Sequence, residues 1–179
     1  MKKAVLIFCI ITQQLSASSI IFDLGNVLMY PDRTYFMQKL GLGMIAEYSL
    51  FYNPLDLEHD FFAFLHSIMP LTDQSFGWNT ETVQFPQLIH EWHKGTYTAE
   101  QIRDIIKKHA PDYCTEYTTQ ENMFLAVADA MFTPSQLAET LTVHPPAIAF
   151  VQLCRMLGHR TYLLSNLDTE TFDCLKEKY

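Results

Sequence analysis

Two short segments near opposite ends of the chain carry the side chains best suited to chemistry. Asp23 follows an apolar run at residues 20–22, and Ser165-Asn166 follow a second apolar run at residues 162–164. A carboxylate beside a hydroxyl and an amide can attack phosphorus or carbon while its neighbours donate hydrogen bonds to the transferred group. The spacing alone does not separate this from a structural role, because an aspartate at a strand end can equally cap a turn.

Both segments are predicted to be strands of an open α/β sheet. Residues 19–28 are predicted to form a strand that breaks at Gly25-Asn26. Polar and apolar residues do not alternate along it, as expected for a parallel strand covered on both faces. The second strand, within residues 158–166, is preceded by a helix from Pro145 that closes at Gly158 and is followed by a helix opening at Asp168 or Thr169. Ligands bind beyond the carboxyl ends of such strands. We therefore expect Asp23 and Ser165 at one edge of the sheet.

The residues between these strands are predicted to be almost wholly helical. Thr98 and Gln101 have the spacing of a capping box, and Gly41 and Gly43 weaken the middle of the first helical segment. A proline ordinarily ends a helix, so the helix that starts at Thr98 is expected to stop before Pro111. The expected helices cover residues 35–45, 57–69, 85–94, 98–110, 119–131 and 134–141.

At these residues the chain resembles the haloacid dehalogenase-like hydrolase superfamily. Residues 22–28 (FDLGNVL) look like the first motif of that family and residues 162–166 (YLLSN) look like its second. Trp92, Gly95 and Thr98 are similar to a cap segment of the group that includes sugar-phosphate phosphatases, epoxide hydrolase amino-terminal phosphatase domains and 2-haloacid dehalogenases. The resemblance implies an α/β fold, with a Rossmann-like core of parallel strands from residues 18–32 and 143–179 and an all-helical cap inserted at residues 33–142.

The resemblance also implies a reaction and a set of site residues. Asp23 would be the nucleophile of a phosphatase that acts on a small phosphorylated metabolite through an aspartyl-phosphate intermediate. The Asp23 carboxylate and the main-chain carbonyl of Gly25 would hold Mg²⁺, a hard cation that prefers oxygen ligands. Ser165 and Asn166 would bind the phosphoryl oxygens.

Two departures from the family pattern keep other functions open. Gly25 stands where phosphatases of this family usually have a second aspartate, which protonates the leaving group. The third and fourth motifs do not occur before Tyr179, so the core is expected to be incomplete at its carboxyl end. One alternative is a 2-haloacid dehalogenase, in which the same aspartate attacks carbon without a metal. The other is a truncated, non-catalytic relative that serves as a binding or accessory protein.

The composition limits the classes of function that the protein can have, and its amino terminus indicates the compartment. The chain has 179 residues, 49% hydrophobic and 18% charged, with a formal charge of −8, which favours a globular protein and argues against a nucleic-acid binder. Lys2 and Lys3, an apolar run at residues 4–11 and Ala17 are typical of a signal peptide over residues 1–17, which is too short to span a bilayer. We therefore expect a secreted or periplasmic protein. The alternative is that residues 5–11 form a buried strand of a cytoplasmic protein.

The remaining candidate residues have simpler interpretations. His90 and His93 could place two metal ligands on one helix face, but no third ligand has a recognisable spacing, so a helix surface is expected. Asp32 and Arg33 could approach an anion or form a surface pair. Three cysteines without metal or redox spacing are expected to be buried packing residues, with a disulfide in an oxidising compartment as the alternative: Cys114, Cys154 and Cys174. A phenylalanine cluster is expected to pack in the cap, with a substrate-lining role for one or two of its members as the alternative: Phe61, Phe62 and Phe64.

Overall fold

The computed structural model describes residues 18–70, 86–165 and 167–179. The fold is mostly helical with a small parallel sheet. The chain divides into two compact units, and the predicted signal peptide lies outside the described residues. Among the described residues, the strand unit comprises residues 18–31 and 141–165, and the helical unit comprises residues 32–70, 86–140 and 167–179. No described helix combines the length and apolar character needed to cross a membrane.

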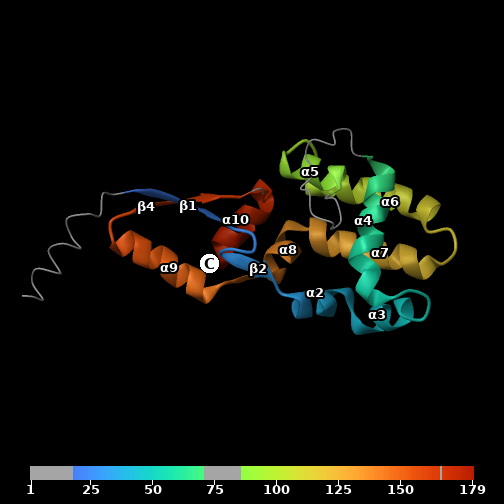
Figure 1. Ribbon diagram of the computed structural model, residues 1–179. Helices are drawn as coiled ribbons and strands as arrows, with labels where there is room; N and C mark the ends of the chain where they lie inside the picture. Colours follow the sequence, from blue (N-terminus) through green and yellow to red (C-terminus); the bar gives the residue numbers. More distant parts are fainter. Residues whose placement is uncertain (1–17, 71–85, 166) are drawn as a thin grey trace, which may run out of the picture. The chain divides into compact units, whose positions relative to one another are not determined.

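The strand unit is built on two parallel strands. β1 (Ser19–Asp23) pairs with β4 (Arg160–Leu164), with Phe22 opposite Leu163. α9 (Pro145–Met156) covers one face of this pair, where the ring of Phe150 meets that of Phe22 edge-on with centroids 6.1 Å apart (Figure 1). The helix begins with proline at its first turn and is followed by Gly158 at a φ of 85°, so the predicted start and stop are confirmed.

The other face of the strand pair carries apolar side chains that remain exposed. Ile21 is 64% exposed and Leu164 is 67% exposed, and Tyr162, opposite Ile21, is half exposed. Side chains alternate between the two faces of a strand, so these residues lie on the side opposite the buried ring of Phe22. Parallel strands are usually covered on both faces. Among the described residues of this unit, only one face of the strand pair is covered by a helix.

A second strand pair lies at the two ends of the helical segment, residues 32–140, where the chain leaves the strand unit and returns to it. β2 (Met29–Pro31) runs antiparallel to β3 (Leu141–Val143), with Pro31 opposite Leu141. The next residues continue the pairing, because the Asp32 amide donates to the Thr140 carbonyl at 2.8 Å. The chain therefore enters and leaves the helical segment at adjacent points.

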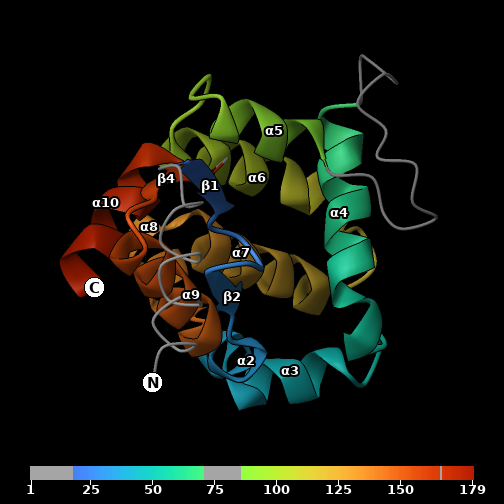
Figure 2. The ribbon, with the colours of Figure 1, turned by 60° about the vertical axis from the view of Figure 1, so that its left-hand side comes forward.

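The buried apolar side chains of the helical unit form one core cluster. Figure 2 shows the helices of this unit. Its elements are α2 (Arg33–Leu40), α3 (Leu42–Tyr48), the short 3₁₀ helix η1 (Pro54–Asp56), α4 (Leu57–Ile68), α5 (Gln87–His93), α6 (Ala99–Tyr113), α7 (Thr118–Phe132), α8 (Pro134–Thr140) and α10 (Thr169–Lys178).

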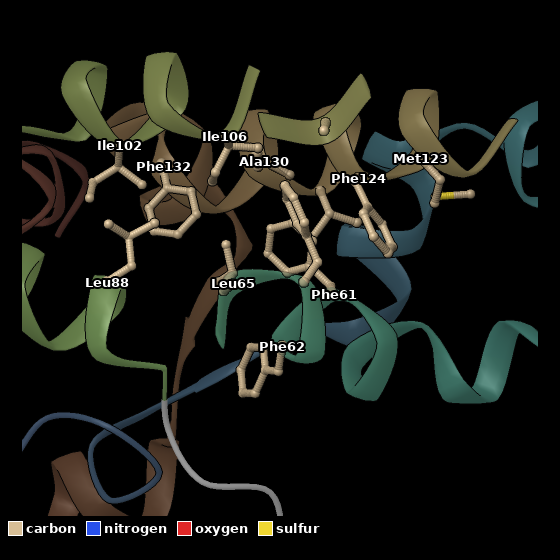
Figure 3. Packing of buried hydrophobic residues seen from close by; sticks show 14 of the residues in the cluster. Phe61, Phe62, Leu65, Leu88, Ile102, Ile106, Met123, Phe124, Ala130 and Phe132 are labelled. Atoms are coloured by element: carbon tan, nitrogen blue, oxygen red, sulfur yellow. The ribbon is translucent and has the colours of Figure 1, made fainter. Parts of the chain in front are cut away.

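Aromatic rings from α4 and α7 form the centre of this core (Figure 3). The ring of Phe124 lies 5.5 Å from that of Phe61 and 5.2 Å from that of Phe64, measured between centroids. Farther along α7, Phe132 meets Trp92 of α5 edge-on at 4.9 Å. The three phenylalanines of α4 are buried, so the predicted packing role of Phe61, Phe62 and Phe64 is confirmed.

Local signals in the sequence place most of these helices correctly. The capping box at the start of α6 is present: the Gln101 amide donates to Thr98 Oγ1, and the Thr98 amide donates to Gln101 Oε1. Gly41, at a φ of 85°, separates α2 from α3 within the predicted segment 35–45. The expected stop before Pro111 is wrong, because α6 continues to Tyr113. Proline has a helical φ and removes only one hydrogen bond here, one turn from the end.

The last helix packs within the helical unit. Lys178 at the end of α10 donates from Nζ to the Ala138 carbonyl of α8 at 2.9 Å. The sequence predicts that residues 143–179 belong with the strands, whereas the structure divides that range after Ser165. The other expected boundaries, after residues 32 and 142, lie within two residues of the observed division.

Truncating the central ring should destabilise the helical unit strongly. Phe124 is fully buried between two other rings, so Phe124→Ala should lower the free energy of unfolding by about 3–5 kcal/mol. Leu42→Ala is the matched control, because Leu42 is 76% exposed and should change stability by about 0.5 kcal/mol or less. Urea unfolding followed by circular dichroism measures both, and similar losses in the two variants would contradict this view of the core.

Candidate functional site

The parallel register brings two of the predicted site residues to neighbouring strand ends. Asp23 is the last residue of β1 and lies opposite Leu164, the last residue of β4. Ser165 follows directly, so the carboxylate and the hydroxyl belong to adjacent positions at the carboxyl edge of the sheet. Asp23 is exposed and Ser165 is half-buried. Asn166, the third predicted site residue, lies outside the described residues.

A tight turn ends β1 immediately after Asp23. The Leu24 carbonyl accepts hydrogen bonds from the amides of Leu28 at 3.1 Å and Met29 at 2.9 Å. Asn26 occupies the left-handed region at a φ of 57°, which asparagine tolerates better than most residues. Leu24 and Leu28 are buried and anchor the turn, while Gly25 is exposed. The carboxylate of Asp23 and the main chain of Gly25 are thus both open to solvent.

The oxygen atoms at this edge suit a hard cation. A carboxylate from Asp23 and a carbonyl from Gly25 are the kinds of ligand that Mg²⁺ takes, and Mg²⁺ commonly binds through one or two carboxylates while keeping several waters. The described part of the chain holds no cluster of three or more histidine, cysteine, aspartate or glutamate side chains that could bind a metal. His90 and His93, which lie on α5, belong to no such cluster among the described residues.

Asp32 and Asp168 act as helix caps in the helical unit. Asp32 Oδ1 accepts from the Tyr35 amide at 3.0 Å at the start of α2, so its main role is local rather than a pair with Arg33. Asp168 Oδ1 accepts from the Thr171 amide at 2.9 Å at the start of α10, as the predicted helix start requires. Asp168 is only 8% exposed, however, which is unusual for an aspartate.

Two hollows mark the surface of the helical unit. The larger, about 500 Å³, lies over α3, α6 and α7 and is lined by both charged and apolar side chains, among them Lys107 and Leu125. The smaller, about 230 Å³, lies between the segment around Trp92–Ala99 and the start of α10, and Asp168 lines it. Sequence reasoning identified Asp168 only as a helix start, because nothing in its spacing indicates that it is buried beside a hollow.

The cysteines behave as packing residues. Cys114 and Cys154 are buried and Cys174 is partly buried, and all three are free thiols. Burial and, to a lesser extent, the negative charge of Glu121 raise the pKa of Cys114 to about 11. A thiol that stays protonated at neutral pH is a poor nucleophile. Cys114 is therefore not a candidate for catalysis.

Comparisons with protein families, with curated proteins and with solved structures found no match to this chain.

The raised pKa of Cys114 predicts slow alkylation in the folded protein. With a pKa of about 11, only about one thiol in a thousand is ionised at pH 8, against roughly a quarter for an ordinary cysteine. Iodoacetamide should therefore label Cys114 at least about a hundredfold more slowly in the native protein than in urea. Peptide mass mapping over time measures both rates, and equally fast labelling in the two states would contradict a buried, protonated thiol.

Proposed function

We propose that this chain is a haloacid dehalogenase-like hydrolase, a Mg²⁺-dependent phosphatase that acts on a small phosphorylated metabolite. The observation that supports the proposal is the register of β1 with β4, which sets Asp23 beside the residue that precedes Ser165. The two motif-like segments lie more than a hundred residues apart in the sequence, yet they end at the same edge of one parallel sheet. That edge is where open α/β sheets bind ligands.

In the proposed reaction Asp23 is the nucleophile. A carboxylate oxygen attacks phosphorus in line with the ester bond, the bond from phosphorus to the ester oxygen breaks, and the alcohol leaves with a proton from solvent. Water then attacks the phosphorus of the aspartyl phosphate, which releases inorganic phosphate and restores the carboxylate. Asp23 is exposed, so both the ester and the second water can reach it.

The neighbouring groups would bind and orient the transferred phosphoryl group. The Ser165 hydroxyl donates a hydrogen bond to a phosphoryl oxygen, and we assign Asn166 the same task. The Asp23 carboxylate and the Gly25 carbonyl would hold Mg²⁺, which neutralises phosphoryl charge when bound. Gly25 has no side chain that could donate a proton to the leaving alcohol. We therefore expect aryl phosphates, whose leaving groups need less protonation, to react faster than alkyl phosphates.

The proposal extends to the architecture. The strand unit would be part of a Rossmann-like core, and residues 32–140 of the helical unit would be an inserted cap. The antiparallel pairing of β2 with β3 supports this, because an insertion that leaves and returns at adjacent points need not disturb the sheet. The mostly helical character of residues 32–140 agrees with the all-helical cap that the family resemblance implies.

Removing the nucleophile should abolish phosphate release. With Mg²⁺ and a panel of aryl and sugar phosphates, the wild-type full chain should release phosphate, whereas Asp23→Asn should fall to background. Ser165→Ala should lower kcat/KM by about 10- to 1000-fold, because it removes one donor to the phosphoryl group. Asp173→Asn, an exposed change on α10, should retain full activity as the control.

The same assay separates the alternatives. A 2-haloacid dehalogenase would release chloride from 2-chloropropionate without Mg²⁺ and would also depend on Asp23. If folded wild-type protein turns over neither substrate class, the proposed hydrolase activity is contradicted and a binding role is favoured. Phosphate release that survives Asp23→Asn would contradict the proposed nucleophile.

We also propose that residues 1–17 are a signal peptide and that the protein is secreted or periplasmic. The positive start, the short apolar run and Ala17 support this. Mass spectrometry of the exported protein should then find Ser18 as the first residue. A chain recovered with Met1 or Lys2 at its amino terminus would refute the cleavage.

A further inference from the structure

The larger hollow of the helical unit combines apolar and charged side chains. Most of its lining comes from one face of α7, along which Thr119, Asn122 and Ala126 recur at helical spacing. α3 and α6 supply the rest of the lining. The volume of about 500 Å³ lies within the range of pockets that hold small molecules, so a ligand of that size has room here.

A lysine without an ionic partner lines this hollow. Among the residues that the structure describes, the side chain of Lys107 forms no ion pair and no hydrogen bond. Arg103, one turn earlier on α6, donates to the Phe132 carbonyl at the end of α7 at 2.6 Å. α6 and α7 therefore run antiparallel, and Lys107 lies beside the middle of α7, near Leu125 and Ala126.

The negative charges of the hollow lie toward the two ends of α7. Glu47, on α3, accepts from Thr119 Oγ1 at 3.2 Å near the start of α7. Asp129, near the end of α7, has its Oδ1 3.9 Å from Arg103 Nε, so a cation compensates its charge. Glu47 forms no ion pair within the described part of the chain. The hollow therefore offers one unpaired charge of each sign, Glu47 and Lys107.

The separation of these two charges indicates the shape of a ligand that fits both. Thr119, which contacts Glu47, and Ala126, beside Lys107, lie two turns apart on α7, which is about 10 Å along the helix axis. An anion that pairs with Lys107 would leave Glu47 unpaired, and a cation at Glu47 would leave Lys107 unpaired. A ligand with both charges at its ends satisfies both side chains at once.

We propose that the larger hollow binds a small zwitterion whose ammonium and carboxylate groups lie at opposite ends of an apolar chain, as in an ω-amino acid. The ammonium group of the ligand pairs with Glu47, its carboxylate pairs with Lys107, and its chain packs against Met44 and Leu125, which also line the hollow. The site lies wholly in the helical unit and needs no turnover at Asp23, so it stands or falls independently of the proposed hydrolysis.

Titration of the full chain with 6-aminohexanoate tests the proposal. Proton–nitrogen correlation NMR should show saturable shifts of amides in α3, α6 and α7, with a Kd of about 1 mM or tighter. Hexanoate lacks the ammonium group and hexylamine lacks the carboxylate, so each should bind at least about fivefold more weakly. The factor is modest because Lys107 and Glu47 are exposed to water.

Two substitutions test the two charges separately. Lys107→Met keeps an apolar stem and removes the ammonium group, so it should weaken binding of 6-aminohexanoate about fivefold without weakening that of hexylamine. Glu47→Gln keeps an oxygen that can accept from Thr119, and it should weaken binding of 6-aminohexanoate to a similar extent without weakening that of hexanoate. Lys108→Met is the matched control, because Lys108 is exposed on α6 outside the lining and its loss should leave binding unchanged.

The substituted side chains are all exposed, so the variants should fold like the wild type, which circular dichroism checks. Three results would overturn the proposal. They are the absence of saturable binding to the folded wild type, binding of hexanoate or hexylamine as tight as that of 6-aminohexanoate, and undiminished binding to folded Lys107→Met and Glu47→Gln.

Discussion

The structure depends on the pairing of segments that are far apart in the sequence. β1 and β4 can form a parallel pair only if the long stretch between them returns to its starting point, and closing so long a loop costs conformational entropy. The pairing of β2 with β3 shortens the effective loop, because Pro31 lies opposite Leu141. The His144 amide, which donates to the Leu28 carbonyl at 2.7 Å, extends this contact toward α9. The helical segment thus begins and ends at one short antiparallel strand pair, β2 with β3.

The two units differ in how much apolar surface they bury. The core cluster of fully and largely buried side chains belongs to the helical unit alone, from Leu40 to Phe132. In the strand unit, Phe22 is buried under α9 while Ile21 and Leu164 remain exposed. Two strands alone are marginally stable in water, and burial supplies most of the folding free energy. The helical unit therefore has the larger independent source of stability, and local opening should begin in the strand unit.

Sequence reasoning succeeded where a few neighbouring residues decide the structure. Thr98 with Gln101, Pro145 and Gly41 each determine a helix end through a local hydrogen bond or a fixed φ, so their effect can be predicted without the fold. Pro111 shows the limit, since the cost of a proline one turn from a helix end is small enough for the packing of the buried Ala110 and Cys114 to offset. The partner of α10 and the burial of Asp168 depend on α8 and α5, which no local pattern specifies.

Asp23 and Asp168 illustrate why one residue type can serve two kinds of chemistry. Asp23 lies at an exposed strand end, where a carboxylate can approach an incoming phosphorus atom and be reached by water afterwards. Asp168 is buried at a helix start, with one oxygen already held by the Thr171 amide. Its other oxygen is buried as well, so an incoming ester cannot reach it. Exposure suits Asp23 to forming a covalent bond, and burial suits Asp168 to holding the first turn of α10, because a hydrogen bond is electrostatically stronger where water is excluded.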